Sequence, residues 1–308
     1  MKHTQNCKKR LRRIVLCAVF PLVFIFLFYG PFEAFRLLWI NTAMYSSRFQ
    51  FLAHLFYTEK YIAQVLARNE PSEDRKTDDS ALTVKWGDGV FFTKIHENNY
   101  KGYIIRIDDP TRVLFVQSAE KKGTLLEQLT KKHKGLGGIN ASGYTNPQQM
   151  GIPWGITIAD GRIVSDFSRS ERHIMGGFNA NHKLVVGTFT REAIEAQKYL
   201  WAFEFGPLLI VNGEKTEFTA FSGGLAPRTA IGQTAEGHVL LLVVDGRQIT
   251  SIGATYQNVQ NILYEYGAIN AINLDGGSSA TMVYRGRVVN NPPDGDKERL
   301  LPNAIIFK

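Results

Sequence analysis

The sequence predicts an α+β domain that follows an N-terminal membrane helix. Apolar runs of strand length outnumber helical periodicities, and strands do not alternate regularly with helices. One uncharged run of 19 residues stands near the N-terminus. Mixed sheets with a few packed helices fit this pattern better than a doubly wound parallel sheet.

The N-terminal segment is typical of a signal anchor. Residues 1–13 carry six basic residues and no acidic one, and residues 14–32 carry no charge. As a helix, residues 14–32 would span roughly 28 Å, about the thickness of a hydrocarbon core. The basic flank predicts a single-pass protein of the cell membrane, with a cytoplasmic N-terminus and an extracytoplasmic C-terminal domain. A cleaved signal peptide is the alternative, but no small-x-small cleavage site is evident, which favours an uncleaved anchor.

The basic flank also accounts for most of the net charge of +8. Without its six residues, 30 basic residues face 28 acidic ones, so nucleic-acid binding is not expected. Both cysteines, Cys7 and Cys17, lie in the N-terminal segment. The exported part therefore needs no disulfide and offers neither a reactive thiol nor a cysteine metal site.

Residues 33–80 predict a helical stalk followed by a charged linker. Residues 41–68 place apolar side chains near one helical face. This face suits a stalk, a dimer seam, a helix on the membrane surface or a helix packed on its own domain, so a homo-oligomer stays open. Residues 69–80 hold seven charges in twelve positions, which is linker composition.

Residues 81–308 are long enough for one large domain with a substantial core. Helices are expected over residues 124–134 and 255–266, the second ending at Gly267. Strands are expected over residues 90–95, 103–107, 112–117, 155–159, 183–189, 208–211, 239–244, 268–274 and 304–307.

The stretch Asn273-Leu274-Asp275-Gly276-Gly277-Ser278-Ser279 is the strongest candidate site. A buried strand leads into a carboxylate, and two glycines then allow positive φ and the close approach of a ligand. An acid at a strand tip beside a glycine turn is a rigidly held group that a substrate can reach. An ordinary tight turn, with Asp275 as the turn-former, explains the same residues.

Further polar segments end apolar runs at residues 137–144, 205–213, 227–232 and 243–247. In order and spacing, these segments resemble the phosphodiester glycosidase family over about residues 135–307. The most specific parts are Pro-Arg-Thr-Ala-Ile-Gly at 227–232, Asp-Gly-Arg at 245–247 and the stretch at 273–279. Two departures concern the pocket, and so the sugar: Ala141 replaces a glycine of the family, and Glu204-Phe205 stands where the family tends to have glycines.

The resemblance implies hydrolysis of a sugar-1-phosphodiester at the anomeric carbon, which releases the sugar and leaves a phosphomonoester. Cell-envelope or exopolysaccharide material is the expected substrate. A non-catalytic glycan-binding or polymer-assembly protein on the same fold is one alternative. A phosphodiesterase that cleaves the phosphorus–oxygen bond is another, but the clustered His and Asp ligands of a two-metal site are missing.

Asp275 and Asp245 are the predicted catalytic carboxylates, because glycoside cleavage develops oxocarbenium-like charge. Arg228 and Arg247 are predicted to bind the phosphate through forked hydrogen bonds. Each has an ordinary alternative: a hairpin turn at Asp245 and solvated surface cations at the arginines. The other predicted substrate-binding residues are Asn140, Ser142, Gly143, Thr229, Gly276, Gly277, Ser278, Ser279 and Asn303.

No cofactor is expected. His173 and His182 lack metal-ligand spacing, and no histidine lies in the shared segments, which disfavours a Ser-His-Asp triad. Residues 294–296, Asp-Gly-Asp, could bind calcium but lack the EF-hand ligand pattern. A divalent cation therefore stays open as an alternative.

Overall fold

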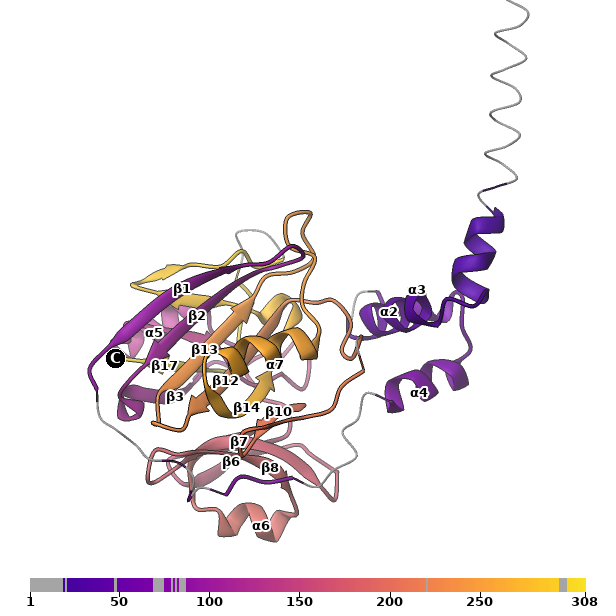
Figure 1. Cartoon of the computed structure of the whole chain (residues 1–308). Coiled ribbons are helices and arrows are strands. Elements are labelled where there is room, and N and C mark those ends of the chain that lie inside the picture. Colours follow the sequence, from indigo (N-terminus) through magenta and orange to yellow (C-terminus); the bar gives the residue numbers. More distant parts are fainter. Residues whose placement is uncertain are drawn as a thin grey trace, which may run out of the picture. The chain divides into compact units, whose positions relative to one another are not determined.

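The structure, a computed structural model, describes residues 19, 21–46, 49–68, 75–78, 80, 82, 87–219, 221–293 and 298–308 (Figure 1). The chain divides into two compact units, Met1–Ala67 and Arg68–Lys308.

Short helices make up the described part of the N-terminal unit. The helix predicted over residues 41–68 is not continuous, and this prediction was wrong. Thr58 begins a new helix, because its hydroxyl accepts a hydrogen bond from the Tyr61 amide at 3.3 Å. Apolar residues such as Ile40, Ala53 and Val65 form the core of this unit. The helices are Pro21–Tyr29, α2 (Glu33–Met44), α3 (Phe51–His54) and α4 (Glu59–Ala67).

The predicted membrane anchor lies partly outside the described residues. Within the described part, no single helix combines the length and the hydropathy that crossing a membrane requires. Pro21–Tyr29 and Glu33–Met44 meet the criterion only as a pair, and this pair is bent by 82°. The anchor and the extracytoplasmic location therefore stay predictions.

Three antiparallel sheets build the large unit, which confirms the α+β class. The seven-stranded sheet has the order β1 (Val90–His96), β2 (Lys101–Ile107), β13 (Val239–Val244), β12 (Arg228–Thr234), β14 (Ala268–Leu274), β10 (Leu208–Val211) and β11 (Glu214–Lys215). The second sheet has the order β16 (Arg287–Val288), β15 (Met282–Tyr284), β4 (Gly137–Asn140), β17 (Asn303–Phe307) and β3 (Val113–Gln117). The third has the order β6 (Arg162–Asp166), β5 (Ile156–Ala159), β9 (Tyr199–Glu204), β7 (His173–Asn179) and β8 (Leu184–Phe189).

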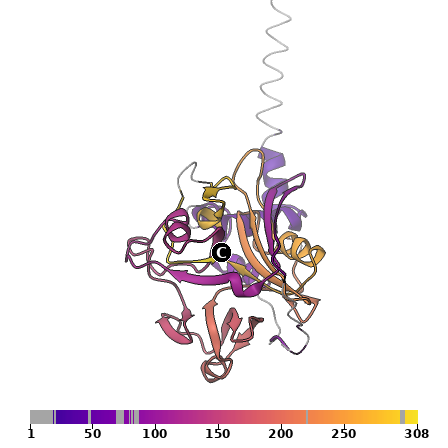
Figure 2. The same ribbon diagram turned by 90° about the vertical axis from the view of Figure 1, so that its left-hand side faces the viewer.

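The seven-stranded sheet is covered on both faces. Its side chains alternate between the two faces, so neighbouring residues of one strand pack in different clusters. Ile104 and Leu240 pack in one cluster with Val259 of α7 (Tyr256–Glu265), which lies along the sheet (Figures 1 and 2). Ile105 packs in another cluster, which joins this sheet to Ile305 of the second sheet and to residues of the third. The other helices are α5 (Leu126–Lys132) and α6 (Arg191–Ala196).

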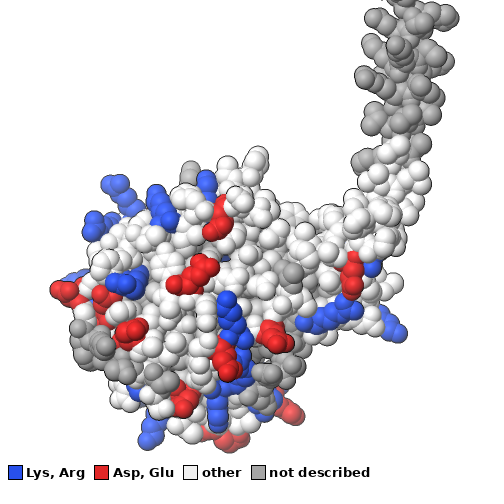
Figure 3. Space-filling model, viewed as in Figure 1, with Lys and Arg blue, Asp and Glu red and all other residues white. Residues whose placement is uncertain are grey.

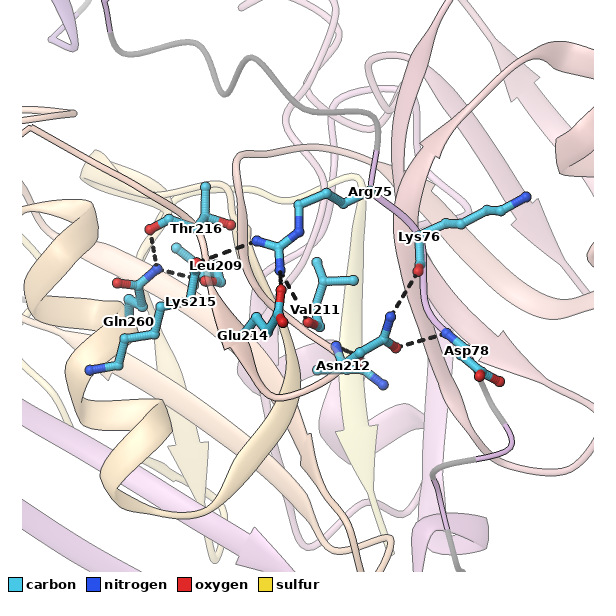
Figure 4. Close-up of polar contacts among 11 residues, drawn as sticks. Arg75, Lys76, Asp78, Leu209, Val211, Asn212, Glu214, Lys215, Thr216 and Gln260 are labelled. Carbon is cyan, nitrogen blue, oxygen red and sulfur yellow. Dashed lines mark hydrogen bonds and ion pairs between the residues drawn. The ribbon is translucent and has the colours of Figure 1, made fainter.

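Residues 75–78, which fall in the predicted linker, are hydrogen-bonded to other segments of the large unit (Figure 4). The Thr77 amide donates to the Val186 carbonyl of β8 at 2.9 Å. The Asn212 side chain donates to the Lys76 carbonyl at 3.1 Å and accepts from the Asp78 amide at 2.7 Å. This segment therefore joins an edge strand of the third sheet to the β10–β11 hairpin.

Charges of both signs are interspersed over the face of the large unit that Figure 3 displays. This mixture agrees with the near balance of basic and acidic residues beyond residue 13. A basic stripe of the kind that binds nucleic acid is not visible among the described residues on that face.

Candidate functional site

Asp275 directly follows β14, a strand held between β12 and β10. Its backbone amide donates to the Ala141 carbonyl at 3.0 Å. Its carbonyl accepts from Nδ2 of Asn140 at 2.5 Å. Asn140 ends β4 of the second sheet, so both sides of the Asp275 peptide are fixed where two sheets meet.

Asn140 is fully buried and organises this junction. Its Oδ1 accepts from the Thr229 hydroxyl at 2.8 Å and from the Thr281 amide at 3.2 Å. The structure thus brings the predicted site residues Asn140 and Thr229 to Asp275, where Asn140 holds the Asp275 carbonyl and Thr229 holds Asn140. A buried amide with both ends bonded is a rigid link rather than a mobile contact.

Ser142 and Asn303 form a second buried link beside the first. The Ser142 amide donates to Oδ1 of Asn303 at 2.8 Å, and both residues are buried. Gly143 follows, and a Cβ on it would lie 4.0 Å from the carboxyl carbon of Asp275. The structure therefore brings Gly143 beside the carboxylate, with Ser142 held behind it along the chain.

The two glycines after Asp275 are required by their surroundings. A Cβ on Gly276 would lie 2.6 Å from the Pro227 carbonyl oxygen. Gly277 has φ +58° and donates its amide to the same oxygen at 2.9 Å. A Cβ on Gly277 would lie 3.3 Å from Nη2 of Arg247, so this guanidinium covers the turn. Ser278 and Ser279 complete the turn and are buried.

The carboxyl group of Asp275 has an unusual pKa. Burial raises this pKa from its ordinary value of 3.8 to about 6, because a charged carboxylate loses water there. The Ser279 hydroxyl, the Arg299 charge, the Gly276 backbone and the Arg247 charge each offset part of the rise. A raised carboxyl pKa in a polar junction makes Asp275 a candidate catalytic group.

Arg299 is a site residue that the sequence did not reveal. Its charge lowers the pKa of Asp275, and its Nη1 donates to the Tyr144 hydroxyl at 3.2 Å. The guanidinium carbon lies 5.6 Å from the Tyr144 ring centroid. No motif surrounds Arg299, and only its place between the polar positions Asn290 and Asn303 could have suggested it.

Asp245, the second predicted carboxylate, is almost fully buried, at 2% exposure. Its Oδ1 accepts from Nδ2 of Asn290 at 3.1 Å and from the Asn291 amide at 2.9 Å. Burial raises the pKa of Asp245, and these two bonds offset part of the rise. Asn290 in turn donates to the Ala280 carbonyl at 3.0 Å. Asp245 is therefore linked to the chain that leaves the glycine turn.

Arg228 is buried in the large unit. Its side chain is 4% exposed and lies over the Tyr256 ring, 4.2 Å from the centroid. Its Nε donates to the Ala254 carbonyl at 3.0 Å, and its Nη2 donates to the carbonyls of Gly223 and Gly224. These contacts stabilise a loop, so Arg247 and Arg299 are better placed than Arg228 to act on an anion beside Asp275.

No group of three His, Cys, Asp or Glu side chains able to hold a metal ion occurs in the described part of the chain. Residues 294–296, the calcium alternative, lie outside the described residues. The expectation of no cofactor stays a prediction.

Comparisons with known proteins agree with the resemblance. The model of the family described as phosphodiester glycosidase matches residues 133–308. The SPbeta prophage-derived uncharacterized protein YomE of Bacillus subtilis is 26% identical over 216 residues, which cover 64% of this chain and 31% of that protein. The N-acetylglucosamine-1-phosphodiester alpha-N-acetylglucosaminidase of Mus musculus is 26% identical over 218 residues, which cover 63% of this chain and 41% of the mouse protein. The chain thus spans less than half the length of either relative.

A solved structure shares the fold. It is the catalytic domain of zebrafish N-acetylglucosamine-1-phosphodiester alpha-N-acetylglucosaminidase, described as auto-inhibited by its pro-peptide. The TM-score is 0.62 at 20% identity, and the match covers 82% of this chain and 93% of the zebrafish chain. At this identity the similarity establishes the architecture alone.

Proposed function

The chain belongs to the phosphodiester glycosidase family, and we propose that it hydrolyses a sugar-1-phosphodiester at the anomeric carbon. The observation that carries the proposal is Asp275, a carboxylate with a pKa of about 6 that follows β14 and is fixed on both sides of its peptide. The products of this reaction are a free sugar and a phosphomonoester. The name of the mouse relative states the same bond type for that enzyme.

Asp275 is the main catalytic carboxylate in this proposal. Above pH 6 it is mostly ionised and stabilises the oxocarbenium-like charge at the anomeric carbon. The leaving group is a phosphomonoester with a second pKa of about 6, so it needs less protonation than a sugar alkoxide. Neutralising its charge matters more, and Arg247 and Arg299 supply positive charge beside Asp275.

Asp245 supports the reaction by positioning. Its bonds to Asn290 and Asn291 fix the segment that follows the glycine turn. The sequence predicts Asp245 as a second catalytic carboxylate beside Asp275, acting as general base or nucleophile. Its low exposure and its bonded Oδ1 favour the positioning role.

We place the large unit outside the cytoplasm, on a membrane anchor, with cell-envelope or exopolysaccharide glycans as substrates. The support is the run of six basic residues ahead of residues 14–32. A protease added to intact cells should cleave within the large unit. Full protection, in cells whose surface is accessible to the protease, would refute this topology, and a mature chain lacking residues 1–35 would indicate a cleaved signal.

The reaction is tested with the full chain in detergent and a panel of methyl phosphodiesters of hexose 1-phosphates. In water labelled with oxygen-18, cleavage at the anomeric carbon places the label in the sugar. Label in the phosphate would indicate a phosphodiesterase that cleaves the phosphorus–oxygen bond. Glycan binding without turnover would indicate an assembly protein. Asp275→Asn is the control for contaminating activity.

A further inference from the structure

Trp154 is an exposed aromatic residue on a short two-stranded ribbon at the site. Its indole is 43% exposed. The ribbon is antiparallel, since Tyr144 bridges to Pro153 and the Thr145 amide donates to the Ile152 carbonyl at 3.1 Å. The Trp154 amide donates to the Gly143 carbonyl at 2.9 Å. This register places Trp154 directly opposite Gly143.

The register also sets the side of the ribbon from which the Trp154 side chain projects. Residues directly opposite in an antiparallel pair carry their side chains on the same face. A Cβ on Gly143 would point toward the Asp275 carboxyl carbon, at 4.0 Å, and the Phe205 ring, at 3.2 Å. The Trp154 side chain therefore projects from the face of the ribbon that borders Asp275. Because Gly143 has no side chain, the space between the indole and the carboxylate is not filled from this position.

The ribbon is anchored just beyond Trp154. Gly155 has φ +74°, and a Cβ on it would lie 2.8 Å from Cβ of Glu204. The Ile156 amide donates to Oε2 of Glu204 at 2.9 Å. Glu204 is itself buried, with its Oε1 accepting from the Ser168 hydroxyl at 2.9 Å. These contacts hold the backbone that presents Trp154 in place.

We infer that Trp154 is the platform on which a pyranose ring stacks beside Asp275, an inference that rests on the proposed function. The C–H groups of a pyranose make an apolar face, which an indole covers at low entropic cost. The electron-rich indole face also favours the positive charge that develops on the sugar ring during cleavage. Trp154 is thus a specificity-determining residue that selects sugars with an uninterrupted apolar face.

This inference gives the departure at Glu204-Phe205 a physical role. Glu204 holds the strand that follows Trp154, and Phe205 contacts the Gly143 position next to Asp275. The two side chains therefore contact both strands of the ribbon that carries Trp154.

The test compares Trp154→Ala and Trp154→Phe in the full chain, with Phe91→Ala as the matched control. Phe91 is an exposed aromatic residue on β1, at 50% exposure. Kinetics use the methyl phosphodiester of N-acetylglucosamine 1-phosphate, and calorimetry measures binding of N-acetylglucosamine 1-phosphate. We expect Trp154→Ala to raise KM and Kd at least tenfold, Trp154→Phe to restore most of the loss, and Phe91→Ala to change neither. Thermal unfolding should be unchanged in all three variants.

The outcomes separate this inference from the proposed function. If the wild type turns over the substrate and Trp154→Ala has the same KM and Kd as the wild type, the platform is overturned and the proposed hydrolysis stands. Trp154-dependent binding without turnover by the wild type would support the platform and refute the hydrolysis. A wild-type chain that binds neither probe would overturn the platform as well.

Discussion

Replacing Asp275 by Asn should stabilise the large unit at neutral pH while it abolishes most activity. Burial raises the pKa of Asp275 from 3.8 to about 6, so the folded protein holds a desolvated charge above pH 6. At 1.36 kcal/mol per pKa unit, this shift corresponds to about 3 kcal/mol. Allowing for screening at a partly exposed carboxylate, we expect a gain of about 1–3 kcal/mol in the free energy of unfolding at pH 8.

The sign of this effect depends on pH. A raised carboxyl pKa means that the folded chain binds more protons than the unfolded chain between pH 4 and pH 6. The wild type therefore loses more stability than Asp275→Asn as pH rises through this window, because the variant keeps only the raised pKa values of other carboxyl groups such as Asp245. Denaturant unfolding of the full chain at pH 4 and pH 8 measures the difference. Unfolding is followed by intrinsic fluorescence, to which the four tryptophans of the chain contribute. Of these, Trp201 is buried in the large unit and stacks on Phe178, with 4.8 Å between the ring centroids.

Activity should change in the opposite direction. If the ionised carboxylate supports the transition state, turnover in Asp275→Asn should fall at least a hundredfold, on the order of 3 kcal/mol. The wild-type kcat/KM should rise with pH, with an inflection near 6 that the variant lacks. A variant that is fully active, or that is less stable than the wild type at pH 8 but not at pH 4, would refute the reasoning.

Substitutions at three further residues test the surrounding groups. Arg228→Lys should lower the free energy of unfolding by about 1–3 kcal/mol, because lysine cannot replace the bonds to the loop carbonyls; an unchanged stability with a loss of kcat/KM would instead favour the phosphate clamp. Arg247→Gln should raise the pKa of Asp275 further, so the inflection in the kcat/KM profile should move to higher pH; an inflection that stays in place would remove Arg247 from the site. Asp245→Ala should reduce both stability and kcat, because Asn290 loses an acceptor, whereas Asp245→Asn keeps an acceptor oxygen and should lose less of each; equal losses in the two variants would argue for a role of the Asp245 charge itself.

Local patterns predicted the elements whose sequences carry unambiguous periodicity. The strands at 208–211, 239–244 and 268–274 occur with the expected bounds, because continuous apolar runs are buried on both faces of the central sheet. The helix expected over 255–266 occurs as α7, with Thr255 as its N-cap and Tyr266 as its C-cap. Strands such as β7, with Gly176 and Gly177 in its middle, were missed because glycines argue against a strand and only tertiary packing selects it.

The candidate site was predicted as a set of residues but not as a geometry. The motif around Asp275 identified the carboxylate, because a strand tip and a glycine turn are local features. Segments distant in sequence decide whether an arginine bonds loop carbonyls, as Arg228 does, or lies near the carboxylate, as Arg299 does. The sequence alone therefore could not show which of the two arginines acts on Asp275. Trp154 was missed for the same reason, since its relation to Asp275 depends on the register with Gly143.

The motif residues hold one carboxylate in place, and this is their main role in the proposed reaction. Asn140 bonds the backbone of Asp275, Thr229 orients Asn140, and Asn303 bonds the adjacent chain at Ser142. A carboxylate kept partly desolvated destabilises the fold, and a flexible turn would relieve that cost by moving the charge into water. The Asn140 amide, which is bonded at both ends, opposes this movement. A sequence signature rich in Asn, Thr and Gly therefore suits a single desolvated carboxylate, and beside it Oγ of Ser142 and Nδ2 of Asn303 are buried polar atoms without a protein partner among the described residues.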